Sequence, residues 1–404
     1  MSHLTKRFLR TFVTGVLSLA LLPGIGACGF GASDAASQTA AATQPATATP
    51  TPAETTPQTQ TYTDELFLTG DLLMHKPVYT DGLQADGTYN YTSMFTDLSD
   101  MAQGYDLKYY NQESILGGTQ LGLSSYPCFN SPQEAGDAMV ADGFNLVSTA
   151  NNHSLDKGEA GIQSSVEYWK KQEKYDVHMA GTYESADEQD DIHVYAKNGI
   201  TYSFLSWTYG CNGLKPPSGK DYLVNMYPDR VDEMLNQVRE ADQKSDVVIV
   251  AMHWGIEYQF DPSDEQKTLA QQLADAGADI IIGNHPHVIE PVQWLNDGKT
   301  ICYYAMGNMI SSQREEKTRI GMVGGVTITK TVTDGTTTDV KVSNARADLI
   351  YTYYDSAIRN FKIIPFDKLD DAHLANHDQV YAKYTPIITQ MDPNITVGGI
   401  RLAS

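Results

Sequence analysis

Two apolar, β-branched runs that each end in histidine constrain the fold of this chain more than any other feature. Residues 247–252 lead directly into His253, and residues 278–283 lead into His285 and His287. A helical pattern with a Pro-Ser start signal separates the runs, so this stretch predicts a strand, a helix and a second strand. Ligands bind outside the carboxyl ends of strands in open α/β sheets, so three imidazoles there predict a metal site.

Polar side chains also end the earlier predicted strands. Runs at residues 65–74, 107–110 and 144–149 contain or lead into Asp71, His75, Glu113, Asn152 and His153. Each of these alone is also explained by a turn, a helix cap or a solvated surface. Together with the three histidines above they form a set that chance rarely produces, which favours one shared site. The remaining histidines beyond the N-terminal segment are expected to be structural or on the surface: His178, His193, His373 and His377.

The Asn152-His153 pair has a specific chemical interpretation. An amide oxygen can complete a metal shell where another carboxylate would add too much charge. The adjacent imidazole can protonate a leaving oxygen. The plainer alternative is a turn rich in residues that tolerate a left-handed backbone.

The order of elements predicts an α/β (α+β) fold, built as a layered sandwich of mixed β-sheets flanked by helices. Strands and helices alternate through most of the chain, and hairpins are expected at Asn198-Gly199 and at Asp334-Gly335. A chain of 404 residues with 41% hydrophobic content can bury a large core. Acidic residues outnumber basic ones by 50 to 28, with no basic stripe, so nucleic acid is not an expected partner.

The first residues predict a secretory signal of the lipoprotein type. Basic residues at positions 6, 7 and 10 precede an apolar run at 12–22, which is too short for an ordinary membrane span. The following Ile25-Gly26-Ala27-Cys28 resembles the bacterial lipobox, in which the cysteine is lipidated and becomes the mature N-terminus. A plain signal peptide with a chance cysteine is the alternative. We therefore expect a protein on the extracellular face of a bacterial membrane, anchored through Cys28.

An Ala/Thr/Pro/Gln-rich segment follows, and it lacks the apolar side chains needed to fold. We expect it to be a disordered linker at 29–63. Beyond Cys28 the chain has Cys128, Cys211 and Cys302, an odd number without a CxxC spacing. We interpret them mainly as small core residues, although one disulfide with a free thiol remains an alternative.

Six motifs occur in an order that resembles the CapA-like family of capsule, or poly-gamma-glutamate, biosynthesis proteins. They are TGDLLMH, NQES, ANNHSLDKG, MHWGIEY, GNHPHV and AMGN, between about residues 66 and 311. That family looks like a branch of the calcineurin-like metallophosphoesterases, which implies a metallo-dependent phosphatase-like fold. Two positions depart from its pattern, because Gln112 replaces a leucine and Asn284 replaces a histidine. We expect the first to change packing and the second to alter one polar contact.

The resemblance implies a role for each motif residue and two divalent ions, of Mn, Zn, Fe or Mg. His153 would be the general acid, with Asn152 and Asp156 beside it. The metal ligands would be Asp71, His75, Glu113, Asn152, His253, His285 and His287. Substrate or outer-shell contacts would come from Trp254, Glu257 and Asn308. The domains would be the signal at 1–28, the linker at 29–63, a CapA-like domain at 64–311 and a β-rich extension at 312–404 packed on it.

Three functions fit these features. The first is a surface lipoprotein that is a metal-dependent hydrolase or transferase, acting on a capsule or cell-envelope polymer of poly-gamma-glutamate or phosphoester type. Other capsule-synthesis proteins would be its partners. The second is a non-catalytic capsule-assembly or polymer-binding lipoprotein that keeps the fold. The third is a transporter's solute-binding lipoprotein, which would bury its ligand between two lobes and would not need five histidines at strand ends.

Overall fold

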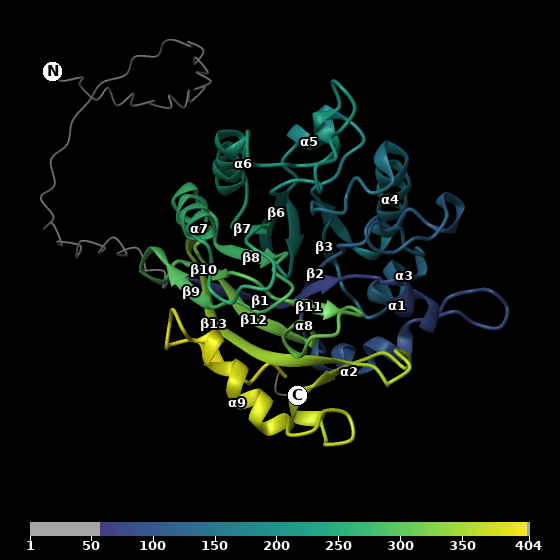
Figure 1. Cartoon of the computed structure of the whole chain (residues 1–404). Helices are drawn as coiled ribbons and strands as arrows, with labels where there is room; N and C mark the ends of the chain where they lie inside the picture. Colours follow the sequence, from purple (N-terminus) through teal and green to yellow (C-terminus); the bar gives the residue numbers. More distant parts are fainter. Residues whose placement is uncertain (1–56, 402–404) are drawn as a thin grey trace, which may run out of the picture. The chain divides into compact units, whose positions relative to one another are not determined.

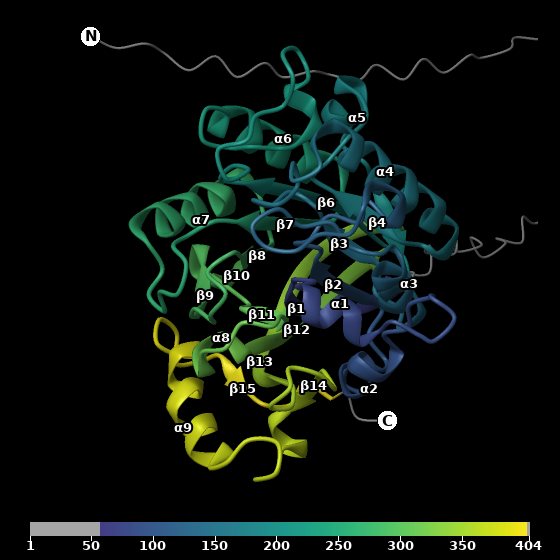
Figure 2. The ribbon, with the colours of Figure 1, turned by 45° about the vertical axis from the view of Figure 1, so that its right-hand side comes forward.

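Two mixed β-sheets stack face to face in the computed structural model, which describes residues 57–401. Helices cover the outer face of each sheet, as Figures 1 and 2 show. The apolar core between the sheets includes Leu66 and Tyr109 from the first sheet and Ile249 and Ile282 from the second, all fully buried. This arrangement confirms the predicted layered sandwich of mixed sheets flanked by helices.

The first sheet has parallel strands in its N-terminal half and antiparallel strands in its C-terminal half. Its order is β14 (Lys362–Pro365), β13 (Thr336–Tyr353), β12 (Ile320–Thr333), β1 (Thr59–Leu72), β2 (Leu107–Asn111), β3 (Leu146–Ser148) and β4 (His178–Ala180). Two short strands join it at the side, β11 (Asn308–Ile310) on β1 and β15 (Thr396–Val397) on β13.

The second sheet is built around three parallel strand pairs, β6–β7, β7–β8 and β8–β10. Its order is β5 (Tyr195–Lys197), β6 (Ile200–Thr208), β7 (Val247–His253), β8 (Ile280–Asn284), β10 (Thr300–Tyr303) and β9 (Val292–Leu295). Every residue of β7 and β8 is buried, as expected for parallel strands covered on both faces. The hairpin predicted at Asn198-Gly199 joins β5 to β6.

The helices divide between the two sheets according to their apolar faces. On the outer face of the first sheet lie α2 (Thr92–Met101), α3 (Glu134–Ala141) and α4 (Gly158–Gln172), in a core that contains Phe67 and Trp169. On the second lie α6 (Val231–Lys244) and α7 (Asp264–Ala276), around Trp207 and Trp254. The remaining helices are α1 (Lys76–Asp81), α5 (Ala186–Asp190), α8 (Glu316–Arg319) and α9 (His377–Ile388).

The long C-terminal hairpin belongs to the first sheet. Strand β12 pairs antiparallel with β1 from Thr59↔Thr333 to Leu68↔Gly324, and α9 packs against β13. The predicted linker was expected to extend to residue 63, but β1 already begins at Thr59. The Thr/Tyr-rich residues 59–63 are ordered because their backbone groups bond to β12, a non-local contact that composition does not reveal.

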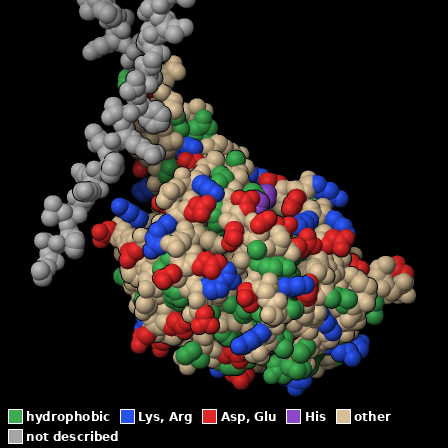
Figure 3. Space-filling model, turned by 90° about the horizontal axis from the view of Figure 1, so that it is seen from above, with side chains coloured by type: hydrophobic (Ala, Val, Ile, Leu, Met, Phe, Trp, Pro, Cys, Tyr) green, Lys and Arg blue, Asp and Glu red, His purple; other side chains and the backbone are tan. Residues whose placement is uncertain are grey.

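Three further observations concern the described residues. Cys128, Cys211 and Cys302 are unpaired, and Cys128 is exposed instead of lying in the core, because it sits in an outer loop. Within residues 57–401, no helix has both the length and the apolar character needed to cross a membrane. On the face shown in Figure 3, Lys and Arg side chains lie among Asp and Glu without forming a basic stripe. The predicted signal sequence, with Cys28, lies outside the described residues.

Candidate metal centre

The carboxyl ends of strands from both sheets meet at one place. Asp71 ends β1, His253 ends β7, and the loop after β8 supplies His285 and His287. The loop after β2 adds Glu113. All five side chains are at least 95% buried, although each carries a titratable group.

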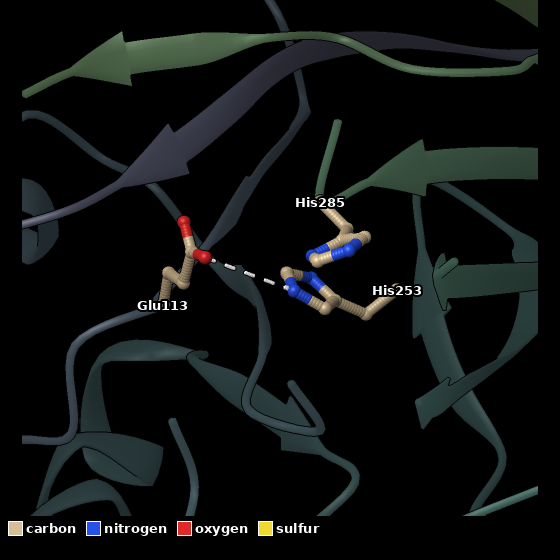
Figure 4. A group of neighbouring side chains, drawn as sticks. All are labelled: Glu113, His253 and His285. Atoms are coloured by element: carbon tan, nitrogen blue, oxygen red, sulfur yellow. Dashed lines mark ion pairs between the residues drawn. The ribbon is translucent and has the colours of Figure 1, made fainter. Parts of the chain in front are cut away.

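Two groups of possible metal ligands share one carboxylate. Glu113, His253 and His285 form the first group, and Asp71, Glu113 and His287 form the second. In each group one ligand atom per residue lies within 4.8 Å of the others. Glu113 Oε1 lies 3.7 Å from His253 Nε2, as drawn in Figure 4, and 3.8 Å from His287 Nε2. Glu113 therefore stands between two potential cation positions.

The loop that carries the two histidines has an unusual backbone. His285 has a φ of 103° and His287 a φ of 58°, both in a region that side-chain-bearing residues rarely adopt. Pro286 lies between them, and its carbonyl accepts a hydrogen bond from the Tyr258 backbone at 2.8 Å. Such conformations cost about 1–3 kcal/mol each and cluster at functional sites. Here they bring both imidazoles to the same carboxylate.

Burial shifts the pKa of every member of the cluster in the direction that favours its neutral form. Desolvation raises the pKa of Asp71 to about 7, against hydrogen bonds from Asn111 and His285, and raises the pKa of Glu113 well above its usual value. It also lowers the pKa of His285 to about 4 and of His287 to about 3. Neutral imidazoles are the form that binds metals, and a cation would favour the ionised carboxylates.

The residues fit a divalent cation on a direct structural test. Both carboxylate oxygens of Glu113 are buried without a hydrogen-bond partner, and so is Nδ1 of His285. Buried polar atoms are almost always satisfied, so three orphans in one cluster indicate a missing partner. Carboxylate oxygens beside imidazole nitrogens form a donor set that suits Mn, Zn or Fe. The carboxylate oxygens would also suit Mg.

The remaining predicted residues of the Asn152 motif surround the first group. Asn152 Oδ1 lies 3.0 Å from His253 Nε2. His153 Nδ1 lies 2.7 Å from Asp156 Oδ2, and the backbone N–H of Phe129 donates to the same oxygen at 2.5 Å. The Phe129 ring then packs edge-on against His153 with 4.6 Å between centroids. The motif therefore holds one amide and one carboxylate-paired imidazole at the site.

Asn308 orients a histidine of the second group. Its Oδ1 lies 3.0 Å from His287 Nδ1, and its amide nitrogen donates to Thr318 O and Gln313 Oε1. Because the nitrogen is committed to acceptors, the oxygen accepts the Nδ1 hydrogen of His287. This hydrogen bond leaves Nε2 of His287 free as a ligand atom, which is a common arrangement around metal-binding histidines.

Three further predicted residues also lie outside the two ligand groups. His75 sits beyond the end of β1, where its Nδ1 accepts the Ser312 backbone N–H at 3.4 Å. Trp254 is fully buried and donates to Tyr304 O at 2.9 Å, so its indole supports the core. Glu257 is exposed, and its charge helps to raise the pKa of Glu113, which places it at the opening of the site.

The two departures from the family pattern have visible consequences. Gln112 is buried, donates to Ser114 O at 2.7 Å and accepts from Tyr110 at 3.2 Å, so a polar pair replaces apolar packing. Asn284 Oδ1 lies 2.5 Å from the Tyr109 hydroxyl, at the base of the site.

Two tyrosines that were not predicted from the sequence stand over the ligand groups. The Tyr209 ring packs on His285 with 4.6 Å between centroids, and the Tyr258 ring lies 6.0 Å from His287. The phenol of Tyr209 donates to Asn212, in the loop after β6. Nothing in the composition of that loop singled out the ring. Tyr258 does lie in one of the motifs, and its φ of 68° marks a special position.

Two sheets whose strand ends converge on buried carboxylates and imidazoles define this chain as an α/β-sandwich protein with a candidate metal centre. Residues 65–313 match the family model described as bacterial capsule synthesis protein PGA_cap, and the chain belongs to this family. The PGA biosynthesis protein CapA of Bacillus subtilis (strain 168) is 30% identical over 269 residues, which span 65% of this chain and 68% of that protein.

Two more distant similarities extend this comparison. The capsule biosynthesis protein CapA of Bacillus anthracis is 30% identical over 195 residues, covering 47% of this chain and 46% of that protein. Among solved structures, a protein described as a novel phosphatase from Mycoplasma pneumoniae aligns with a TM-score of 0.44 and 15% identity. That alignment covers 78% of this chain and 99% of the phosphatase.

Proposed function

We propose that this chain is a lipid-anchored, metal-dependent hydrolase or transferase that acts on a capsule or cell-envelope polymer. The observation that carries this proposal is the carboxylate of Glu113, which is shared by two buried ligand groups and lacks a protein partner on both oxygens. A carboxylate that bridges two cations would account for both features.

The residues that would hold the ions are the members of the two ligand groups and Asn152, whose Oδ1 lies beside His253 Nε2. They are Asp71, Glu113, Asn152, His253, His285 and His287. When bound, divalent ions supply Lewis-acid polarisation of a phosphoryl or carbonyl oxygen and lower the pKa of water. His75 is not included, because it belongs to neither of the two ligand groups.

His153 would act as the general acid that protonates the leaving group. Asp156 accepts the hydrogen on Nδ1 of His153 and stabilises the protonated ring, because the pair is nearly fully buried. The Nε2 hydrogen of that ring is then available to a leaving oxygen or nitrogen. The edge-on contact from Phe129 keeps the imidazole plane fixed.

The substrate is proposed from the relatives and from the chemistry of the centre. The names of both CapA relatives refer to capsule or PGA biosynthesis, which supports a polymer of the cell envelope as substrate. A phosphoester and a gamma-glutamyl amide each present a polarisable oxygen and a leaving group that needs a proton. Both links are therefore candidates for the same residues.

The test is metal analysis of the full-length chain beside a His253→Ala/His285→Ala double variant, followed by assays on phosphoesters and gamma-glutamyl polymers. We expect one or two transition ions per wild-type chain, none in the folded double variant, and turnover of one substrate class. A wild-type chain that stays metal-free after incubation with Mn²⁺ and Zn²⁺ contradicts the proposal. A metal-loaded chain without turnover would favour the capsule-assembly role.

The lipid anchor is a separate part of the proposal. It is supported by the basic residues, the short apolar run and the Ile25–Cys28 lipobox-like sequence at the N-terminus. Expression of a Cys28→Ser variant beside the wild type tests it. We expect the wild type to incorporate a labelled fatty acid and to fractionate with membranes. Equal labelling of the two chains would show that Cys28 is not the anchor.

A further inference from the structure

A row of buried hydrogen bonds runs from the second sheet to Asp71. The Tyr109 hydroxyl lies 2.5 Å from Asn284 Oδ1 and 2.8 Å from Ser148 Oγ. Ser148 Oγ lies 2.8 Å from Asn111 Oδ1, and Asn111 Nδ2 donates to Asp71 Oδ1 at 2.8 Å. The row therefore ends on a carboxylate of the candidate metal centre.

The row connects the two sheets through side chains alone. Tyr109 and Asn111 lie on β2 and Ser148 on β3, whereas Asn284 ends β8 of the other sheet. None of the four is more than 2% exposed, so water does not compete for these contacts. Buried networks of this kind rigidify the groups at their ends when every member is satisfied.

A count of hydrogens shows that Tyr109 must serve both neighbours. Three contacts involve the two hydroxyls: one joins Tyr109 to Ser148, and one joins each hydroxyl to an amide. Each hydroxyl carries only one hydrogen, so the two hydroxyls supply two of the three hydrogens that are needed. The third hydrogen has to come from an amide, and Asn111 already directs its nitrogen at Asp71. Asn284 can supply it by turning its amide, because its nitrogen is buried without a partner in the arrangement described.

The turned amide has a consequence for Asp71. In the arrangement described, the Asn284 nitrogen lies near the Asp71 carboxylate without a hydrogen bond to it. After the turn, the nitrogen donates to Tyr109, and the carbonyl oxygen faces Asp71 instead. A carbonyl oxygen beside a carboxylate is stable where a cation lies between them. A cation at Asp71 would therefore complete the hydrogen bonding of the whole row.

We propose that Tyr109 is a positioning residue for the metal centre: its hydroxyl accepts from Asn284 and donates to Ser148, and so orients both amides around Asp71. This inference rests on the proposed metal-dependent function. Without the hydroxyl, the row breaks at its middle, and Asn284 and Ser148 have no common partner. Loss of such an outer contact lowers metal affinity by about 10- to 100-fold in other metal sites.

The test compares Tyr109→Phe with Tyr303→Phe in the full-length chain. Tyr303 is a matched control, because it is fully buried in the same core and its hydroxyl also has two partners, Gly325 O and Arg346 O. The affinity for Mn²⁺ and for Zn²⁺ is measured by competition with a chromophoric chelator. Thermal unfolding of the metal-free chains reports on the fold.

We expect Tyr109→Phe to bind at least one of the two ions about 10-fold more weakly than the wild type, whereas Tyr303→Phe keeps wild-type affinity. Unchanged affinity in Tyr109→Phe, or an equal loss in both variants, overturns the inference and leaves the proposed function intact. A wild-type chain that binds neither ion overturns both. If Tyr109→Phe does not fold, Ser148→Ala removes the next hydroxyl, and the same weakening is expected.

Discussion

Nδ1 of His153 lies 2.7 Å from Oδ2 of Asp156, three residues further along the loop that leads into α4. The Asp156 side chain is 1% exposed and also accepts the Phe129 backbone N–H. Its position is therefore fixed by the loop that follows β2, and not only by its own turn. The imidazole is oriented by two loops that belong to neighbouring parallel strands.

Asp156→Asn should lower turnover without lowering metal content. The amide can no longer stabilise a protonated His153, so we expect kcat on the substrate class that the assays reveal to fall by about 100-fold. Metal analysis and steady-state kinetics on the same preparation provide the measurement. Glu159→Gln, a nearby pair partner of Lys220, is the control and should keep wild-type kcat. Parallel losses of metal and of kcat in Asp156→Asn would instead point to a structural role.

Glu113→Gln should abolish the stabilisation that metal ions confer. An ion at 100 times its dissociation constant stabilises the folded state by about 2.7 kcal/mol, which raises Tm by several degrees. The variant loses the shared carboxylate, so added Mn²⁺ or Zn²⁺ should leave its Tm unchanged. Its metal-free Tm should equal or exceed that of the wild type, because a neutral amide avoids burying a charge. Calorimetry with and without chelator distinguishes these outcomes.

Glu290 should make stability depend on pH between its unfolded and folded pKa values. Desolvation raises the pKa of Glu290 from 4.5 to about 8, although Gln266 Nε2 donates to it at 2.5 Å. The folded state then holds the proton more tightly. This contribution is full below pH 4.5 and is lost as the pH rises through 8. We expect Glu290→Gln to reduce this loss by about 2–4 kcal/mol.

Urea unfolding of Glu290→Gln and of the wild type at several pH values across this window measures the difference. The exposed Glu240→Gln on α6 serves as the control and should follow the wild-type curve. Identical pH profiles for all three chains would show that Glu290 does not titrate differently in the folded and unfolded states.

Gly283→Ala should be far more damaging than substitution of an open glycine. A Cβ at Gly283 would lie 1.7 Å from Tyr304 O, the carbonyl that accepts from Trp254. Backbone cannot yield at that distance, so we expect a loss of more than about 4 kcal/mol and of metal binding. Gly87 has a φ of +88° but open space around it, and Gly87→Ala should cost only about 1–2 kcal/mol. Chemical unfolding of both variants provides the comparison.

The sequence by itself determined which residues end the strands. The apolar runs before His253 and His285 become β7 and β8 because a run of buried, β-branched residues is a local signal that needs no partner to be read. The ordered motifs identified the family and predicted that Asp71 and Glu113 belong to the same metal site as the histidines. The carboxyl ends of parallel strands share an edge, so their convergence followed from topology.

Only the tertiary structure decided how these side chains are used. It separated His75 from the ligand groups, buried Trp254, and placed Tyr209 over His285. These positions depend on loop conformation and on contacts between strands that lie far apart in the sequence. The row from Asn284 to Asp71 has the same origin, since it exists only because the two sheets stack face to face.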